Sequence, residues 1–202
     1  MVISKLAWSL LMESIKVKDL MVDLSEYSSV SEEATLYEAV MTLEKAHRKF
    51  DRKRYKYRVI LVHDNNNRIV GLLSDLEVLS GLEPTYKEIG DVRSIALSGF
   101  SAEFLKTMAA NYRLWQQPLG DICGKAAQIK VKNIDYTVVE GNYITKNATL
   151  NEAIHQLIVG YHQNLLVVNG EEKNIVGVLR LYDVFKQVYK MLKTCQIKAH
   201  QT

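Results

Sequence analysis

One eleven-residue pattern occurs twice in the chain, about a hundred residues apart. Residues 69–79 read IVGLLSDLEVL and residues 175–185 read IVGVLRLYDVF, with five of the eleven positions identical. Most of the other positions exchange one apolar residue for another, whereas the polar residues differ. Because an internal repeat determines the architecture of a chain, this pattern constrains the fold more strongly than any other feature.

Each copy of the pattern is preceded by a second apolar stretch and a polar turn. In the first copy these are VILV (59–62) and DNNNR, and in the second LLVV (165–168) and NGEEKN. An apolar strand, a polar turn and another apolar strand predict a β-hairpin.

A helix is predicted upstream of each hairpin, in ATLYEAVMTLEKA (34–46) and ATLNEAIHQLIVG (148–160), where apolar residues recur at helical spacing. Both segments begin with T-x-x-E, which is typical of a capping box. In that motif the threonine hydroxyl and the glutamate carboxylate accept hydrogen bonds from backbone amides at the helix start. The residues concerned are Thr35 with Glu38 and Thr149 with Glu152.

The complete unit therefore reads strand, helix, strand, strand, helix. A short strand is predicted before each first helix, ending near Val30 and Ile144, and the apolar period changes back to 3.6 after each hairpin. The first copy is eight residues longer between its helix and its hairpin. Between the copies, SAEFLKTMAANYRLW (101–115) predicts a further helix, ended by Pro118 and Gly120.

This order resembles a tandem pair of CBS domains, often called a Bateman module. The motifs that carry the resemblance are VKDLM (17–21), then A-T-L-x-E-A, the hairpin and h-V-G-h-h-x-x-x-[DE]; they recur as LGDIC (119–123), ATLNEA and IVGVLRLYDVF. The resemblance implies an α+β fold of two β-α-β-β-α repeats, packed with pseudo-twofold symmetry and joined by a helical connector. The expected divisions are an N-terminal helix (1–14), repeat 1 (15–82, with a basic insertion at 47–58), the connector (83–117), repeat 2 (118–192) and a tail (193–202).

The resemblance also implies a function. In this family two clefts between the repeats commonly hold adenosine compounds, namely AMP, ADP, ATP or S-adenosylmethionine. The modules usually pair into a flat homodimer and regulate an attached or partner protein, whose identity the sequence leaves open. We therefore expect a regulatory sensor rather than an enzyme, with an adenosine nucleotide as ligand and no required cofactor. A scaffold that keeps the fold for dimerisation and binds no nucleotide is the alternative.

The family's ligand motif, G-h-h-[ST]-x-x-D, maps onto the repeated pattern. A carboxylate in the first helical turn binds the ribose, and the hydroxyl at the helix start faces phosphate, where free amides and the helix dipole favour anions. In repeat 1 the matching residues are Gly71, Ser74 and Glu77, so a longer acid replaces the aspartate. S-x-x-E is also a capping box that needs no ligand, and both interpretations stay open.

In repeat 2 the matching residues are Gly177, Arg180 and Asp183. Asp183 keeps the aspartate, whereas Arg180 replaces the hydroxyl. Arginine is a good phosphate partner, because its guanidinium can bind two oxygens at once. The alternative is that Asp183 only complements the helix dipole while Arg180 points to solvent. Each glycine allows the backbone to pass close to a ligand or to a neighbouring strand.

The insertion HRKFDRKRYKYR (47–58) combines basic and aromatic residues, and it permits three interpretations. The first interpretation is a solvated helix end and loop. The second is a contact to nucleotide phosphate, made by Arg58 or Lys56, or to an acidic partner. The third is a site for single-stranded nucleic acid. The net charge of +3 is too small to indicate nucleic-acid binding by itself, so nucleic acid is the least favoured partner.

The remaining motifs do not indicate catalysis or metal binding. The five histidines and two cysteines lack metal-ligand spacing, and GDICGKA (120–126) fails the phosphate-loop pattern and is expected to be a loop. We expect no catalytic and no metal-binding residues. Two isolated cysteines fit a reducing compartment, which predicts the cytoplasm. The apolar N-terminal stretch is too short to span a bilayer and lacks the features of a secretory signal, so we expect no membrane partner.

Overall fold

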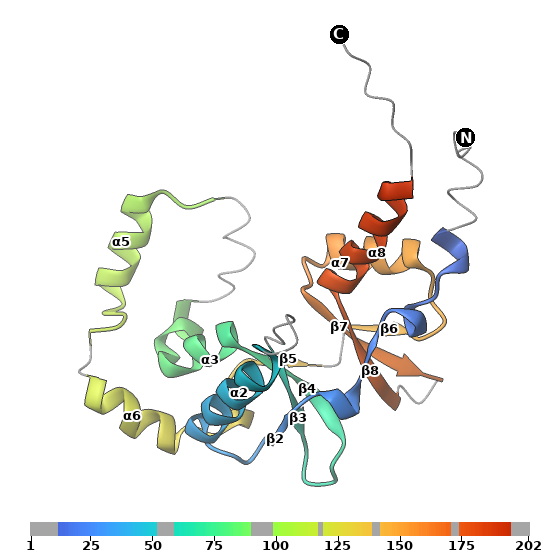
Figure 1. The fold of residues 1–202 in the computed structure, drawn as a ribbon. Helices are drawn as coiled ribbons and strands as arrows, with labels where there is room; N and C mark the ends of the chain where they lie inside the picture. Colours follow the sequence, from blue (N-terminus) through green and yellow to red (C-terminus); the bar gives the residue numbers. More distant parts are fainter. Residues whose placement is uncertain are drawn as a thin grey trace. The chain divides into compact units, whose positions relative to one another are not determined.

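The computed structural model describes residues 12–51, 59–89, 99–116, 119–138, 142–170 and 174–194. The chain forms two compact units. Unit 1 combines Met1–Glu26 with Val138–Thr202, and unit 2 is Tyr27–Thr137. Each unit contains one mixed sheet (Figure 1). Each unit also has its own hydrophobic core.

Unit 2 contains the first repeat in the predicted order. Its elements are β2 (Ser29–Ser31), α2 (Leu36–Asp51), β3 (Val59–His63), β4 (Ile69–Ser74) and α3 (Asp75–Leu82). The chain up to Val138 then adds η3 (Pro84–Ile89), α5 (Ala102–Asn111), α6 (Leu119–Gln128), η4 (Val131–Asn133) and β5 (Thr137–Val138).

Unit 1 contains the second repeat together with the N-terminal segment. From the N-terminal segment come η1 (Val17–Asp19), β1 (Val22–Asp23) and η2 (Leu24–Glu26). From the second repeat come β6 (Tyr143–Thr145), α7 (Leu150–Val159), β7 (Asn164–Asn169), β8 (Asn174–Arg180) and α8 (Leu181–Thr194). Helices α7 and α8 lie next to each other in this unit (Figure 1). The β-α-β-β-α order predicted from the sequence is therefore confirmed in both repeats.

Each sheet gains a fourth strand from the segment that leads into the other repeat. The sheet of unit 1 has the order β1-β8-β7-β6, in which β1 is antiparallel to β8 and β6 is parallel to β7. The sheet of unit 2 has the order β2-β3-β4-β5, with β2 parallel to β3. The three-stranded sheet expected from each repeat alone is therefore extended by an exchanged strand, and the contiguous boundaries 15–82 and 118–192 do not coincide with the compact units.

Two short 3-10 turns anchor the exchanged segments. Val17 in η1 is fully buried in the core of unit 1, and its backbone N–H donates to the Ala148 carbonyl at 2.9 Å. Val131 in η4 is fully buried in the core of unit 2, where its N–H donates to the Ala34 carbonyl at 2.9 Å. The segment equivalent to VKDLM is thus the one beginning at Val131, and the prediction that LGDIC plays this part is wrong.

Residues 119–123 lie instead in α6, as does all of GDICGKA, which had been expected to form a loop. Ile122 and Ala126 are four residues apart, which is helical spacing, and Ala126 is buried where α6 packs against α2 and α3. The two glycines weaken a helix by only about 1 kcal/mol each, and tertiary packing overrides that cost.

Some helices end at residues other than those predicted. The connector helix stops at Asn111, and a turn follows in which Arg113 and Trp115 have positive φ angles of 52° and 57°. Leu114, between them, is buried. Helix α2 continues through Asp51 into the basic insertion, whose remaining residues 52–58 lie outside the described residues. Most of the predicted N-terminal helix also lies outside them.

The capping boxes at the first helix of each repeat form as predicted. The N–H of Thr35 donates to the Glu38 carboxylate at 2.7 Å, and the N–H of Thr149 donates to the Glu152 carboxylate at 2.6 Å. These backbone hydrogen bonds are the main reason why the pKa of each glutamate is lowered. The stabilisation is therefore present above the ordinary glutamate pKa and is lost on acidification.

Gly177 is required by the approach of the exchanged strand. A Cβ at this position would lie 2.7 Å from the carbonyl oxygen of Val22 and 2.9 Å from the sulfur of Met21. We expect Gly177→Ala to separate β1 from β8 and to lower the free energy of unfolding by about 1–2 kcal/mol, as overpacking does. Urea denaturation measures this change.

Gly124→Ala is the matched control, since a Cβ at Gly124 meets nothing within 4 Å and the residue lies in α6. We expect this control to be neutral or slightly stabilising. Equal stability of the Gly177→Ala protein and the wild type would contradict the close approach of β1.

Candidate functional site

The predicted ligand-binding residues lie where each hairpin strand runs into the next helix. In unit 2, Gly71 is buried in β4, Ser74 ends this strand and Glu77 lies in the first turn of α3. In unit 1, Gly177 is buried in β8, Arg180 ends the strand and Asp183 lies in the first turn of α8. The structure thus brings Ser74 into contact with Glu77 and Arg180 into contact with Asp183, whereas Arg58 lies outside the described residues.

In unit 2 the acid is engaged by its own helix. The Ser74 N–H donates to Glu77 Oε2 at 2.8 Å, the Ser74 hydroxyl also donates to Oε2, and the Leu76 N–H donates to Ser74 Oγ at 3.3 Å. Glu77 is only 7% exposed. The capping-box interpretation of S-x-x-E is therefore correct for the described structure.

In unit 1 the acid is paired with the arginine instead. Arg180 Nε donates to Asp183 Oδ2 in an i,i+3 ion pair, and the two side chains are 13% and 16% exposed. The alternative in which Arg180 points to solvent is therefore wrong. The pair holds a guanidinium and a carboxylate together at the N-terminal end of α8, where the helix dipole favours anions.

The two copies therefore differ in chemistry at equivalent positions. A buried capping glutamate in unit 2 has no arginine at the position before its helix, whereas unit 1 presents both charges together. Since a nucleotide carries a ribose diol and an anionic phosphate, a carboxylate next to a guanidinium matches both groups. Within the repeated motif, only unit 1 places a carboxylate next to a guanidinium.

A charged contact at the connector was not singled out from the sequence. Glu83, at the end of α3, is 5% exposed, and its carboxylate accepts from the Trp115 backbone N–H at 3.0 Å and from the Thr85 hydroxyl at 2.8 Å. Burial raises the pKa of Glu83, but these hydrogen bonds and the nearby Lys125 outweigh burial and lower it. The sequence signal for this contact was weak, because an acidic residue after a helix is common and Trp115 lies 32 residues from Glu83.

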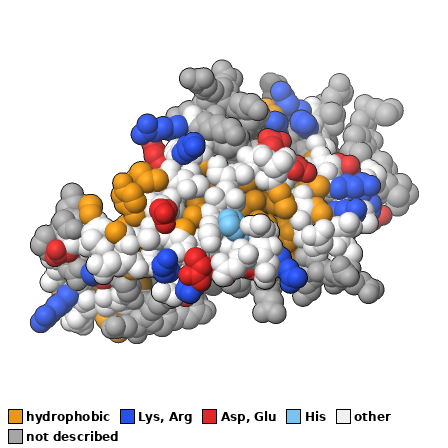
Figure 2. Space-filling view, turned by 90° about the horizontal axis from the view of Figure 1, so that it is seen from below, with side chains coloured by type: hydrophobic (Ala, Val, Ile, Leu, Met, Phe, Trp, Pro, Cys, Tyr) orange, Lys and Arg blue, Asp and Glu red, His pale blue; other side chains and the backbone are white. Residues whose placement is uncertain are grey.

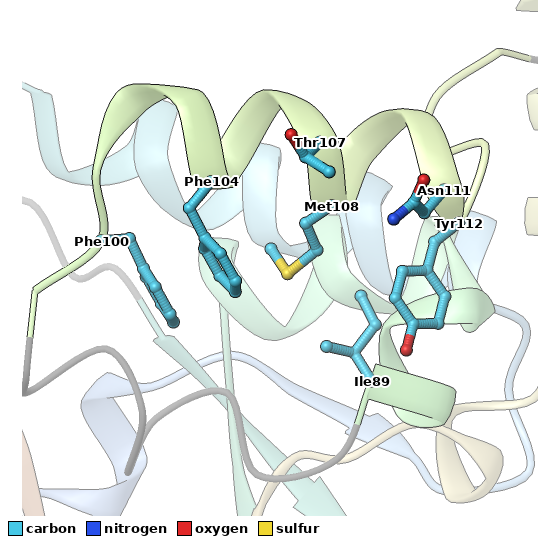
Figure 3. Close-up of a pocket in the computed structure, with 7 residues that line it drawn as sticks. All are labelled: Ile89, Phe100, Phe104, Thr107, Met108, Asn111 and Tyr112. Atoms are coloured by element: carbon cyan, nitrogen blue, oxygen red, sulfur yellow. The ribbon is translucent and has the colours of Figure 1, made fainter.

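A cavity of about 300 Å³ lies beside the connector helix and does not include the repeated motif. Figure 3 shows its mostly apolar lining, with the Phe100 and Phe104 rings stacked at one end, 4.9 Å between centroids. None of the described residues predicted to bind ligand lines it. The lining residues are Ile89, Phe100, Phe104, Thr107, Met108, Asn111 and Tyr112.

Two further expectations concern metals and membranes. Within the described ranges, no group of three or more His, Cys, Asp or Glu residues is arranged to hold a metal ion. Among the helices whose residues the structure describes, none combines the length and the apolarity needed to cross a bilayer. His155 and His162, which share no such cluster, are exposed and half-buried respectively.

The chain belongs to the CBS domain family. The family model matches residues 17–83 and 131–190, which together make up more than half of the chain. The second match begins at Val131, in agreement with the exchanged segment η4. The fold is thus a tandem CBS pair, which is a regulatory class of module.

Solved structures of CBS proteins share this fold. A CBS domain-containing protein of unknown function from Bacillus anthracis is 18% identical, with a TM-score of 0.59, covering 90% of this chain and 98% of that one. The CBS domain of a bacterial CNNM/CorC family Mg2+ transporter in complex with ATP is 16% identical, with a TM-score of 0.54 and coverage of 90% and 92%.

A third structure, CBSX2 in complex with AMP, is 16% identical, with a TM-score of 0.51 and coverage of 89% and 99%. At these identities the likeness concerns the fold alone. No curated protein matches the chain.

Proposed function

We propose that this CBS pair is a regulatory sensor that binds an adenosine nucleotide through Asp183 and Arg180 of the second repeat. The observation that carries the proposal is their ion pair at the start of α8, where strand β8 ends. Asp183 accepts hydrogen bonds from the ribose hydroxyls, and Arg180 pairs with phosphate. Similar folds bound to AMP and to ATP support a ligand of this class.

The first repeat contributes less to binding in this proposal. The Glu77 carboxylate already accepts two hydrogen bonds from Ser74, so using it for ribose would break a capping box. Breaking such a cap costs about 1 kcal/mol of helix stability. The Gly71, Ser74 and Glu77 site is therefore the weaker of the two, and the Arg58 contact remains a prediction.

Binding acts on a partner by population shift. The nucleotide favours whichever arrangement of the module binds it more tightly, and it shifts the equilibrium only by that difference in affinity. We further propose that the module works as a homodimer in the cytoplasm and regulates a separate protein without catalysing a reaction itself.

Calorimetric titration of nucleotide-free protein with AMP, ADP, ATP and S-adenosylmethionine tests the proposal. We expect at least one to bind, and Asp183→Ala to weaken that binding about tenfold or more, since a hydrogen bond to a charged group contributes about 1.5–3 kcal/mol. Arg180→Ala should weaken the binding of ligands that carry more phosphates more strongly than it weakens the binding of adenosine.

Asn174→Ala is the matched control, because Asn174 is exposed at the opposite end of β8. The nucleotide affinity of the Asn174→Ala variant should equal that of the wild type. If none of the four compounds binds and mass spectrometry finds no co-purifying nucleotide, the module is a ligand-free scaffold and the proposal fails.

A further inference from the structure

The cavity beside α5 shares no residue with the motif assigned to nucleotide binding. Apolar side chains also reach the surface among charged ones on the face that Figure 2 shows, and exposed apolar side chains of this kind are normal on proteins. The cavity differs from such a surface because it is concave. Its volume of about 300 Å³ lies at the lower end of the range of small-molecule pockets, so it can enclose a small ligand.

One wall of the cavity is a row of apolar side chains on α5. Phe104, Met108 and Tyr112 are spaced four residues apart, which places them on one side of the helix over about 12 Å. Figure 3 shows these side chains projecting from the same side of α5, with Ile89 of η3 beside Tyr112. The Phe100 ring lies nearly parallel to the Phe104 ring, at an angle of 9°. The row therefore begins with a stacked pair of aromatic rings.

Hydrogen bonds tie the two walls of the cavity together. Trp115, which follows α5, donates from its backbone N–H to the Glu83 carboxylate at 3.0 Å and from its indole N–H to the Tyr86 hydroxyl at 3.1 Å. Tyr86 belongs to η3, the same 3-10 helix that supplies Ile89. Because α5 and η3 are joined in this way, the cavity exists before a ligand enters, and binding then costs less conformational entropy.

Two polar groups at one end of the cavity are available to a ligand. The Thr107 hydroxyl already donates to the Glu103 carbonyl at 2.9 Å. By contrast, no hydrogen bond among the described residues uses the side-chain amide of Asn111 or the hydroxyl of Tyr112. In Figure 3 these two residues lie at the end of the row opposite the stacked phenylalanines. A mostly apolar pocket with a few polar groups that fix orientation is typical of small-molecule sites.

The lining also selects against charged ligands. Within the part of the chain that the structure describes, no charged side chain lines the cavity. An ionised group that left water for this site would have no partner of opposite charge, and such burial is unfavourable. A nucleotide phosphate therefore does not fit, and the ligand must be of another class.

We propose that the cavity beside α5 is a second ligand site, which binds an uncharged small molecule with a flat aromatic body and one hydrogen-bonding group. The flat body packs against the Phe104 ring and Met108. The hydrogen-bonding group meets Asn111 and Tyr112 at the other end. This inference goes beyond the nucleotide site, because the module then responds to two ligands of different chemistry.

Fluorescence titration of the nucleotide-free full chain tests the proposal. The probe is N-phenylnaphthylamine, which is uncharged, has fused aromatic rings and carries one N–H, and which fluoresces strongly in apolar surroundings. We expect a saturable increase with one probe bound per chain. Anilinonaphthalene sulfonate has the same rings and adds an anionic group. It should displace the bound probe at least tenfold less effectively, because the lining offers no cation.

Substitutions on α5 locate the bound probe. Phe104→Ala should raise the dissociation constant of the probe about tenfold or more, because it removes one of the stacked rings. Tyr112→Phe removes only a hydroxyl and should raise it about two- to tenfold. Leu105→Ala is the matched control, since Leu105 is the next residue of α5, is 45% exposed and does not line the cavity. Its affinity should be that of the wild type, and circular dichroism verifies that each variant folds.

Three results would overturn the inference. Fluorescence that rises without saturation, or an equal loss of affinity in Phe104→Ala and Leu105→Ala, would mean that the probe adsorbs to exposed apolar side chains. Equal displacement by the sulfonate would contradict an uncharged ligand. All of these measurements are made without nucleotide. Their failure would therefore remove the second site and leave the sensor proposal to its own calorimetric test.

Discussion

Val17→Asp is expected to unfold the C-terminal repeat, although residue 17 precedes the N-terminal one. Val17 is fully buried in the core of unit 1, where it packs with residues of β6, β7 and β8. An uncompensated buried charge costs about 3–5 kcal/mol, to which the lost apolar burial adds. That loss is a large part of the 5–15 kcal/mol that stabilises a typical domain.

Hydrogen exchange followed by mass spectrometry localises the effect. Amides of β7 and β8 should lose protection first, while β3 and β4 of unit 2 keep more of theirs. Lys18→Asp is the control, because the neighbouring side chain is exposed and its charge change should shift stability by less than about 0.5 kcal/mol. Loss of protection confined to β3 and β4 would contradict the exchanged connection.

Glu83→Ala is expected to lower the free energy of unfolding by about 2–3 kcal/mol. The substitution leaves the Trp115 N–H and the Thr85 hydroxyl without their shared acceptor at a partly buried site, where the loss is at most the about 1–3 kcal/mol that each unsatisfied buried donor costs. It also releases the turn whose Arg113 and Trp115 have positive φ angles, a conformation that depends on its surroundings. Urea unfolding at neutral pH measures the loss.

The pH dependence gives a second, independent measurement. The pKa of folded Glu83 is lowered, so its stabilisation is complete above the unfolded glutamate pKa and disappears as the pH falls through the lower folded value. The stability difference between wild type and Glu83→Gln should therefore be largest near neutral pH and shrink below about pH 4.

Glu103→Gln is the matched control, an exposed glutamate of the connector helix α5. The Glu103→Gln variant should show neither the loss of stability nor its dependence on pH. A constant difference between wild type and Glu83→Gln from pH 7 to pH 3 would exclude an ionised carboxylate as the source of the effect.

The elements of both repeats could be predicted because their signals are local. Continuous apolar runs separated by polar turns predicted the hairpins, and helical spacing with T-x-x-E predicted α2 and α7 together with their capping boxes. The close positions of Arg180 and Asp183 follow from a strand that runs directly into a helix. The ion pair of Arg180 with Asp183 lies within the repeated pattern, and ligand binding at this place stays a prediction.

Pairings between distant segments could not be predicted from local signals. LGDIC resembles VKDLM in its letters, but α6 packs on α2 and α3, and Val131 fills the buried position instead. The contact of Glu83 with Trp115 depends on a turn whose conformation no short motif specifies.

The sequence by itself determined the repeat and the order of the elements in each repeat, because period and capping are properties of neighbouring residues, and the resemblance of its motifs indicated the family. Only the tertiary structure decided that each sheet takes its fourth strand from the segment leading into the other repeat, and that Arg180 pairs with Asp183 while Glu77 caps its own helix. The physical reason is that buried backbone groups and charges bind whichever partner the packed chain brings within reach, at any separation in the sequence.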